Sequence, residues 1–325
     1  MTNGSESDVQ VLGAGVVGLT TAITLAEAGL RVSVRTARPP GATTSVAAGA
    51  VWGAVTCGPP ERVRAWAATG LAVFRELAAD PATGIRSRRG RELSRVPSDP
   101  ASWLDLLDDL EFCHDGELPP GFVSGWRYTA PVIAMPVYLE YLAARLEQSG
   151  VKIHVNPLTS LAEVTGDSHG APVTVNCTGV AARQLVPDPA VHPIRGQVVV
   201  IANPGIEEFA IDHSQPAPNV SYLFPHQDTV VLGGTMDDGD WDTGPRPKVA
   251  ERIVADCAVI EPRVRDAPVL AHRVGLRPAR PEVRLEAEPL DGGRVLWHNY
   301  GHGGAGVSLS WGCAREIAAG VLGHE

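Results

Sequence analysis

The chain has 325 residues, of which 44% are hydrophobic and 20% are charged, and its formal net charge is −10 at pH 7. This length suits about two domains of ordinary size, and the composition is typical of a globular protein. The acidic balance argues against nucleic acid or a membrane surface as the main partner, and no apolar run reaches transmembrane length.

The residues 9–34 predict a strand, a glycine turn, a helix and a second strand. Gly13, Gly15 and Gly18 have the spacing G-x-G-x-x-G, and Gly29 ends the helix. We interpret the segment as the dinucleotide-binding unit of a Rossmann-type fold, because the glycines follow a strand and open a helix. Gly13 permits the turn, Gly15 allows a pyrophosphate to approach, and Gly18 lets the helix pack closely. The candidate cofactor contacts in this turn are Gly13, Ala14, Gly15, Val16, Val17 and Gly18.

The end of the second strand carries Arg35 and no carboxylate, which disfavours NAD and leaves NADP or FAD open. An arginine here can meet a 2′-phosphate or a phosphate of FAD. The next segment, 43–49, combines hydroxyls with small residues, so a planar ring or a pyrophosphate can lie against its backbone. A surface loop with capping hydroxyls is an equally good interpretation. The candidate contacts in this segment are Thr43, Thr44, Ser45, Ala48 and Gly49.

The rest of the chain predicts a mixed fold. Helices are expected at 62–79, 102–110, 137–148, 248–259 and about 308–322. Strands are expected at 86–95, 151–155, 173–175, 198–201, 269–276, 283–286 and 295–298, and alternation across 209–235 indicates antiparallel sheet. The basic strand 86–95 is expected to be a solvated face. The predicted class is α/β (α+β overall), with a Rossmann-type domain that is discontinuous in sequence and a second domain built on a mixed or antiparallel sheet.

A second glycine-rich stretch, 298–306, leads directly into the last helix. The positive end of that helix can stabilise negative charge on a flat ligand. The alternatives are a second phosphate loop or a glycine turn without a ligand, and spacing does not decide among them.

Several motifs resemble those of the FAD-dependent D-amino-acid oxidase family. The most specific is VLWHNYGHGGAG at 295–306 with WGCA at 311–314, although Trp297 replaces a usually aliphatic residue. The others occur in the family's order along almost the whole chain: VLGAGVVGLTTA at 11–22, TTSVAAGAVW at 43–52, VNCTGVAA at 175–182, RGQVVV at 195–200 and GLRPARPEVRLE at 275–286.

The resemblance implies a site for FAD and a D-amino acid. It assigns the substrate carboxylate to Arg277 and the Tyr222 hydroxyl, and the substrate amine to the carbonyl of Gly304. A guanidinium binds a carboxylate bidentately, although Arg273 and Arg280 are competitors, and a surface ion pair is the alternative for Arg277. A second active-site tyrosine of animal members is replaced by Pro218. The flavin contacts carried over are Gly303, Gly304, Gly306, Val307 and Ser308.

The implied domains are 6–53, 131–190 and 279–325 for FAD, and 54–130 and 191–278 for substrate. The implied reaction passes a hydride from Cα to flavin N5. Oxygen then reoxidises the flavin and yields hydrogen peroxide, and the imino acid hydrolyses to a 2-oxo acid and ammonia. A homodimer is possible, because family members are often dimers.

We expect neutral or apolar D-amino acids to be preferred over D-aspartate. No lysine or arginine lies between Arg195 and Arg246, which leaves His213 and His226 as the candidate cations for an acidic side chain. The alternatives are a D-aspartate oxidase, a glycine or sarcosine oxidase of the same superfamily, and an NAD(P)-dependent dehydrogenase or silent nucleotide-binding module.

The cysteines and the chain ends indicate the compartment. Five scattered cysteines without a C-x-x-C pair predict neither a metal site nor a disulfide framework. The first ten residues lack a signal-peptide pattern, and residues 322–325 lack the S-K-L address, so the cytoplasm is expected.

Overall fold

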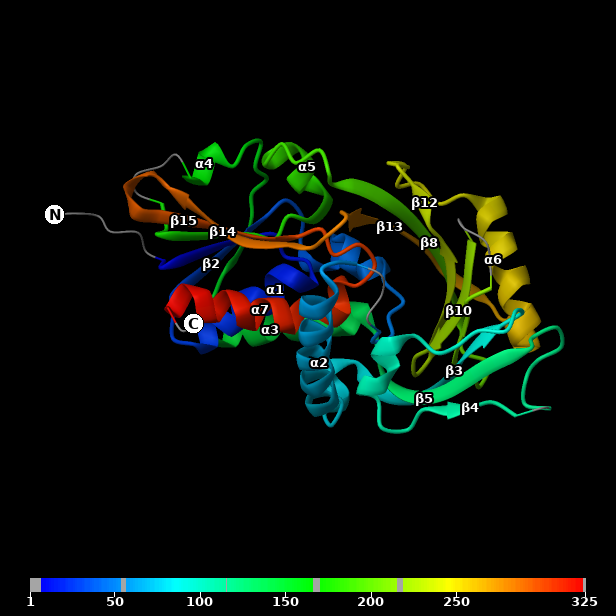
Figure 1. Cartoon of the computed structure of the whole chain (residues 1–325). Coiled ribbons are helices and arrows are strands. Elements are labelled where there is room, and N and C mark those ends of the chain that lie inside the picture. Colours follow the sequence, from blue (N-terminus) through cyan, green and yellow to red (C-terminus); the bar gives the residue numbers. More distant parts are fainter. Residues whose placement is uncertain (1–6, 54–56, 115, 166–169, 215–218, 324–325) are drawn as a thin grey trace.

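The computed structural model describes residues 7–53, 57–114, 116–165, 170–214 and 219–323. Two β-sheets lie side by side, with helices between them and on their outer faces (Figure 1). Pro218, where a family tyrosine is replaced, lies outside the described residues. No helix in the described ranges is both long enough and apolar enough to cross a bilayer.

The six-stranded sheet has the order β14-β15-β7-β1-β2-β6. All its neighbours pair in parallel except β14 and β15, which form an antiparallel hairpin. This central parallel order is the one expected of a doubly wound nucleotide-binding fold. Its strands are β1 (Val9–Leu12), β2 (Val32–Thr36), β6 (Ile153–Val155), β7 (Val173–Asn176), β14 (Arg284–Leu290) and β15 (Arg294–Tyr300).

Helices from distant parts of the chain cover one face of this sheet. They are α1 (Val16–Glu27), α3 (Met135–Gln148) and α7 (Gly306–Leu322), and α1 contacts both α3 and α7 (Figure 1). The short helices α4 (Ala162–Thr165) and α5 (Ala182–Leu185) lie on the other side of the sheet.

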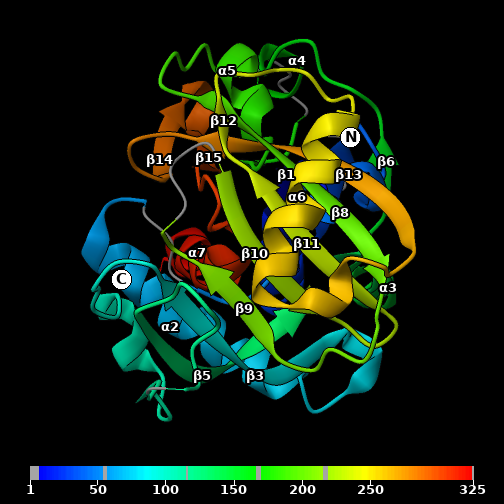
Figure 2. The same cartoon turned by 90° about the vertical axis from the view of Figure 1, so that its right-hand side faces the viewer.

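The larger sheet has nine strands, in the order β12-β8-β11-β10-β9-β3-β5-β4, with β13 also paired to β8. Helix α6 (Pro247–Ile260) packs on its outer face (Figure 2). The opposite, inner face looks toward the first layer. The strands are β3 (Ile85–Ser94), β4 (Glu111–Phe112), β5 (Ser124–Ile133), β8 (His192–Ala202), β9 (Phe209–Asp212), β10 (Asn219–Pro225), β11 (Thr229–Thr235), β12 (Asp237–Asp238) and β13 (Val269–Ala279).

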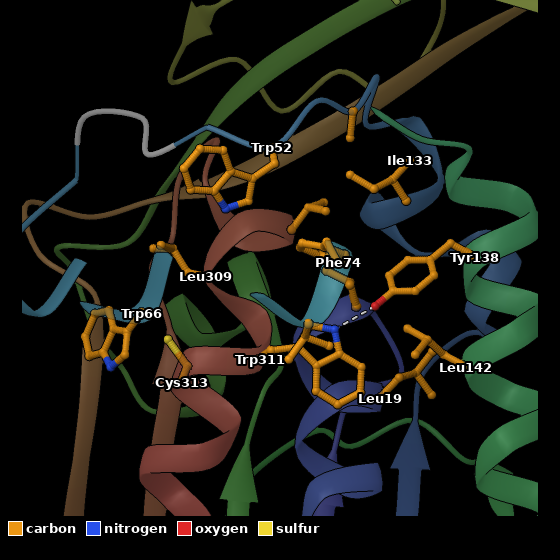
Figure 3. Close-up of a cluster of buried hydrophobic side chains, with 14 of the residues drawn as sticks. Leu19, Trp52, Trp66, Phe74, Ile133, Tyr138, Leu142, Leu309, Trp311 and Cys313 are labelled. Carbon is orange, nitrogen blue, oxygen red and sulfur yellow. Dashed lines mark hydrogen bonds between the residues drawn. The ribbon is translucent and has the colours of Figure 1, made fainter. Parts of the chain in front are cut away.

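Helix α2 (Pro60–Leu77) joins the two layers through the main hydrophobic core (Figure 3). It crosses α7 at close range, because a Cβ at Gly70 or at Gly312 would overlap the backbone of the other helix. Trp311 of α7 donates from Nε1 to the Tyr138 hydroxyl at 2.8 Å, which satisfies both buried polar groups. One core therefore spans residues of both sheets and fixes the layers against each other.

Most of the predicted elements are confirmed, and two are corrected. The first strand occupies 9–12 as predicted, and Gly29 has the left-handed φ of +91° expected after a helix. The helix predicted at 102–110 is only a 3₁₀ turn, Ser102–Leu106. The strand expected to be solvated is β3, and its second half is largely buried because β3 lies between β9 and β5.

The mixed fold class is confirmed. We propose the domain division given above, because every strand of the six-stranded sheet falls within 6–53, 131–190 and 279–325. The boundaries after residues 130 and 278 cut through the ends of β5 and β13.

Candidate active site

Strand β13 presents an arginine to the space between the layers. Alternation along the strand places Arg273, Gly275 and Arg277 on one face. The guanidinium of Arg277 donates from Nη1 to the carbonyl of Thr235 at 2.9 Å. It lies directly over Gly196 of the neighbouring strand, where a Cβ would overlap the guanidinium. The absence of a side chain at Gly196 therefore leaves the space that the Arg277 guanidinium occupies.

Tyr222 of β10 lies beside this arginine. Its ring covers Gly233 of β11, where a Cβ would overlap the ring, and it stacks on Phe224 with centroids 4.4 Å apart. Burial raises the pKa of Tyr222, and the nearby charge and hydrogen bond of Arg277 lower it in part. Because the guanidinium donates to the phenol oxygen, the Tyr222 O–H remains available as a donor.

The second glycine loop lies next to Arg277. A Cβ built on Gly304 would stand 3.9 Å from Cδ of Arg277. Gly303 donates its N–H to the carbonyl of Pro278 at 2.8 Å, which ties the loop to the end of β13. The three residues that the resemblance assigned to substrate, Arg277, Tyr222 and Gly304, are thus brought together.

The two competing arginines are engaged elsewhere. Arg280 forms an ion pair with Asp188 at 3.1 Å and donates to the carbonyl of Glu282. Arg273 approaches the carbonyl of Val46 at 3.4 Å. Among the described residues no ion pair involves Arg277, so the surface ion-pair alternative is not what the structure contains.

The first glycine turn is packed backbone to backbone. Gly13 has a φ of +105°, and a Cβ there would stand 2.5 Å from the carbonyl oxygen of Cys177. A Cβ at Gly18 would overlap the carbonyl of Gly13, so the close approach of α1 to the turn requires glycine. These two observations confirm the turn and packing roles predicted for Gly13 and Gly18.

The two helix starts lie side by side. A Cβ on Gly306, the first residue of α7, would be 3.8 Å from Cγ2 of Val17 in the first turn of α1. The Ser45 hydroxyl accepts a hydrogen bond from the Val16 N–H at 2.9 Å and stands 3.0 Å from a Cβ built on Gly15. The segment 43–49 therefore reaches the positive end of α1.

The same segment is braced by the large sheet. His226 bonds through Nε2 to the carbonyl of Gly49 at 3.0 Å, and Gly49 itself lies against the ring of Phe224. Thr44 and Ala47 contact Gly275 of β13. The segment 43–49 extends from the start of α1 to the side of the site where Tyr222 lies. Its small residues Ala48 and Gly49 form the end nearest Tyr222.

Three of the predicted cofactor contacts also have hydrogen-bond partners within the protein. Thr43 donates from its hydroxyl to the carbonyl of Pro40, as the loop alternative predicted. Ser308 accepts from the Gly53 N–H at 3.1 Å. Arg35 uses Nε and Nη2 on the carbonyls of residues 156 and 157 and on Glu163, so it ties β2 to the segment after β6.

Sequence reasoning missed the glycines beneath the site. Gly196 and Gly233 provide the surfaces on which Arg277 and Tyr222 lie, and they come from two neighbouring strands. The sequence does show Gly196 within the R-G-Q stretch at 195–197. Its role beneath Arg277, however, depends on the pairing of β8 with β13 and β11, which the sequence does not reveal.

Comparison with known proteins is consistent along the whole chain. Residues 8–319 match the family model described as DAO, FAD dependent oxidoreductase. The chain is 50% identical over 311 residues to a D-amino-acid oxidase of Rubrobacter xylanophilus, covering 95% of this chain and 94% of the relative. It is 44% identical to a D-amino-acid oxidase of Streptomyces coelicolor, covering 96% of each chain.

A more distant relative and a solved structure extend the comparison. The chain is 33% identical to a human D-aspartate oxidase, covering 95% of this chain and 93% of the relative. The crystal structure of glycine oxidase from Geobacillus kaustophilus superposes with a TM-score of 0.80 at 20% identity, covering 98% of this chain and 95% of that chain. At this identity the superposition shows a shared fold.

Proposed function

Because the chain belongs to the DAO family of FAD-dependent oxidoreductases, we propose that it oxidises D-amino acids with neutral or apolar side chains. The protein is an FAD-dependent D-amino-acid oxidase, and in the proposed reaction oxygen is the acceptor and the products are a 2-oxo acid, ammonia and hydrogen peroxide. The observation that carries the proposal is the convergence of Arg277, Tyr222 and Gly304 beside the second glycine loop.

The residues present fit FAD, which joins two phosphates to a flat ring. The start of α1 and its turn, 13–18, offer a positive helix end to the phosphates, and the Ser45 hydroxyl, which accepts from the Val16 N–H, lies beside it. A Cβ at Gly303 would meet no atom within 4 Å, and those at Gly304 and Gly306 would meet none closer than 3.6 Å. This open side of the loop is where we place the ring. When bound, FAD supplies the acceptor for the hydrogen and two electrons that leave the substrate's α-carbon.

The protein's part in the reaction is to orient the substrate. Arg277 binds the carboxylate through its planar guanidinium, and the Tyr222 O–H donates a second bond to it. The carbonyl of Gly304 accepts a hydrogen bond from the neutral amine. With the carboxylate and the amine fixed, one of the two remaining groups on the α-carbon faces the cofactor. In the D form this group is the hydrogen, whereas in the L form it is the side chain.

The side-chain preference rests on the two histidines that could have served as cations. Burial lowers the pKa of His226, the hydrogen bond to Gly49 raises it in part, and the charges of Arg273 and Arg88 lower it again, so the charged form of the ring is disfavoured. His213 is paired with the carboxylate of Glu92 at 2.8 Å. Neither histidine offers an unshared positive charge to an acidic side chain, which supports neutral and apolar substrates over D-aspartate.

The test is a peroxide assay on the purified, yellow protein. Flavin absorbance establishes the cofactor, and a panel of D-valine, D-leucine, D-methionine, D-aspartate, glycine, sarcosine and L-leucine separates the candidate activities. We expect the first three to have the highest kcat/KM. A higher value for D-aspartate would identify a D-aspartate oxidase, and a higher value for glycine or sarcosine would identify the corresponding oxidase.

We also propose that the enzyme works in the cytoplasm, with oxygen as its second substrate. All five cysteines are free thiols in the structure, which suits a reducing compartment. A homodimer remains a proposal from the family resemblance, and light scattering of the purified holoenzyme tests it.

A further inference from the structure

A buried carboxylate on the inner face of the large sheet has no part in the mechanism above. The Glu92 side chain is 3% exposed. It accepts hydrogen bonds from Trp126 Nε1 at 2.9 Å, from the Tyr128 hydroxyl and from His213 Nε2 at 2.8 Å. Among the described residues no lysine or arginine pairs with it, so its charge is balanced by His213 alone when that ring is protonated.

The sheet register places Glu92 in one row with the substrate-binding tyrosine. Glu92 of β3 pairs with Ile211 of β9, and Ile211 pairs with Tyr222 of β10. Directly paired residues point to the same face, and strands lie about 4.8 Å apart, so the backbones of Glu92 and Tyr222 are roughly 10 Å apart across one wall. The Tyr222 ring leans over Gly233 toward Arg277. On the other side of Tyr222, away from Arg277, the inner face of the sheet is formed by Ile211 and then by Glu92.

His213 lies between the Glu92 carboxylate and solvent. Its side chain is 46% exposed, and its ring stacks on Trp126 with centroids 6.2 Å apart. Asp212, the next residue back, is turned to the other face and pairs with Arg95 at 3.4 Å. Burial lowers the pKa of His213, but the hydrogen bond and charge of Glu92, together with the charge of Asp212, raise it above its usual value.

We propose that the substrate's side chain extends along the inner sheet face from Tyr222 past Ile211, and that the Glu92 and His213 pair interacts with the charge at its far end. The pair has no net charge while His213 is protonated and a charge of −1 once His213 loses its proton. The kcat/KM for a distal ammonium or guanidinium, as in D-lysine or D-arginine, therefore rises relative to that for a neutral chain as the pH increases, while neutral and apolar substrates keep the highest values. A distal carboxylate is disfavoured over the same range. This inference rests on the proposed D-amino-acid oxidase function.

The test compares three D-amino acids of similar length on the wild-type holoenzyme between pH 6 and 9. D-norleucine is the neutral reference, D-lysine carries a distal cation and D-glutamate a distal anion. We expect the kcat/KM ratio of D-lysine to D-norleucine to rise about fivefold across the His213 titration, and the ratio of D-glutamate to D-norleucine to fall by a similar factor. Because a distal charge shifts the pKa of the α-amino group, that pKa is titrated for each substrate, and kcat/KM is expressed per neutral-amine form before the ratios are taken. Turnover of D-norleucine itself tests the oxidase function separately.

Two variants and a control separate charge from structure. In H213N no imidazole titrates beside Glu92, so both ratios lose the pH dependence assigned to His213. In E92Q the ratio of D-lysine to D-norleucine falls about fivefold at pH 9. The control is E117Q, which makes the same change in net charge; Glu117 pairs with Arg127 on the opposite face of the sheet, and the ratios stay unchanged.

Two results would overturn the proposal. One is wild-type ratios that stay within twofold from pH 6 to 9. The other is an E92Q enzyme whose ratios match those of E117Q. If E92Q does not fold, the pH profile of H213N decides.

Discussion

The two glycine loops of this enzyme use the same residue for different purposes. In the first loop, Cβ atoms at Gly13 and Gly18 would collide with backbone atoms of Cys177 and of Gly13. In the second loop, Cβ atoms at Gly303 and Gly304 would meet nothing closer than 3.9 Å. The fold itself requires the first set of glycines, whereas the second set leaves a space that the protein does not fill. Beside Arg277 and Tyr222, we interpret this open space as the place of a ligand.

The largest effect is expected from Gly18→Ala. Its methyl group would overlap the carbonyl of Gly13, so α1 must move away from the turn on which it packs. We expect a loss of at least about 3 kcal/mol in the free energy of unfolding, measured by urea denaturation of the apoprotein. Gly41→Ala is the matched control, because its methyl group meets no atom and its φ is not left-handed. Equal stability of the two variants would contradict the comparison.

The second loop contains a buried histidine, which makes the free energy of unfolding depend on pH. The side chain of His302, within this loop, is buried, and burial lowers its pKa to about 4. His302 of the unfolded chain binds a proton near pH 6.5, whereas that of the native state does not. Above this pH the histidine does not lower the free energy of unfolding. As the pH falls toward 4, proton binding favours the unfolded chain and the free energy of unfolding decreases. The loss reaches about 3 kcal/mol.

The measurement is urea unfolding of wild type and His302→Gln at pH 7, 6 and 5. The difference between the two proteins isolates the histidine from carboxylates that titrate in the same range. We expect wild type to lose stability relative to the variant at each step. A difference that is the same at pH 7 and pH 5 would show that His302 does not titrate as proposed.

The next effect in size concerns the arginine beside the second loop. Arg277→Leu removes a charge-assisted contact with the substrate carboxylate, so we expect KM for D-leucine to rise at least about tenfold. The free energy of unfolding in urea should change little, because within the protein the guanidinium packs on Gly196 and donates only to the Thr235 carbonyl and the Tyr222 phenol oxygen. Arg273→Leu is the comparison on the same strand face. A larger rise in KM there would move the carboxylate site to Arg273.

The sequence predicted the first loop better than the second because its determinants are local. The strand, turn and helix follow one another within 9–29, so glycine spacing and apolar runs were enough. In contrast, the approach of Val17 to Gly306 depends on the parallel pairing of β1, β7 and β15. The Arg277 and Tyr222 pair came from family resemblance, since no spacing in the sequence links residues of β13 and β10.

The errors have the same origin. The strand β3 was expected to be solvated, because its arginines are visible in the sequence and its burial between β9 and β5 is not. The buried role of Glu92 was hidden for this reason. The cofactor contacts assigned to Thr43 and Ser308 stay predictions; each hydroxyl also has a protein partner that the sequence does not reveal, the carbonyl of Pro40 and the N–H of Gly53.

The smallest effect is expected from Gly304→Ala, and it is the most specific test of the second loop. The nearest atom to the new methyl group is Cδ of Arg277 at 3.9 Å, and the backbone is not left-handed there. The free energy of unfolding of the apoprotein should therefore stay within about 0.5 kcal/mol of wild type. The methyl group does enter the space assigned to ring and substrate, so KM for D-leucine should rise about fivefold, or about 1 kcal/mol. A variant that loses stability as Gly18→Ala does would show that the second loop, too, needs its glycine for the fold, whereas an unchanged KM would show that no ligand approaches it.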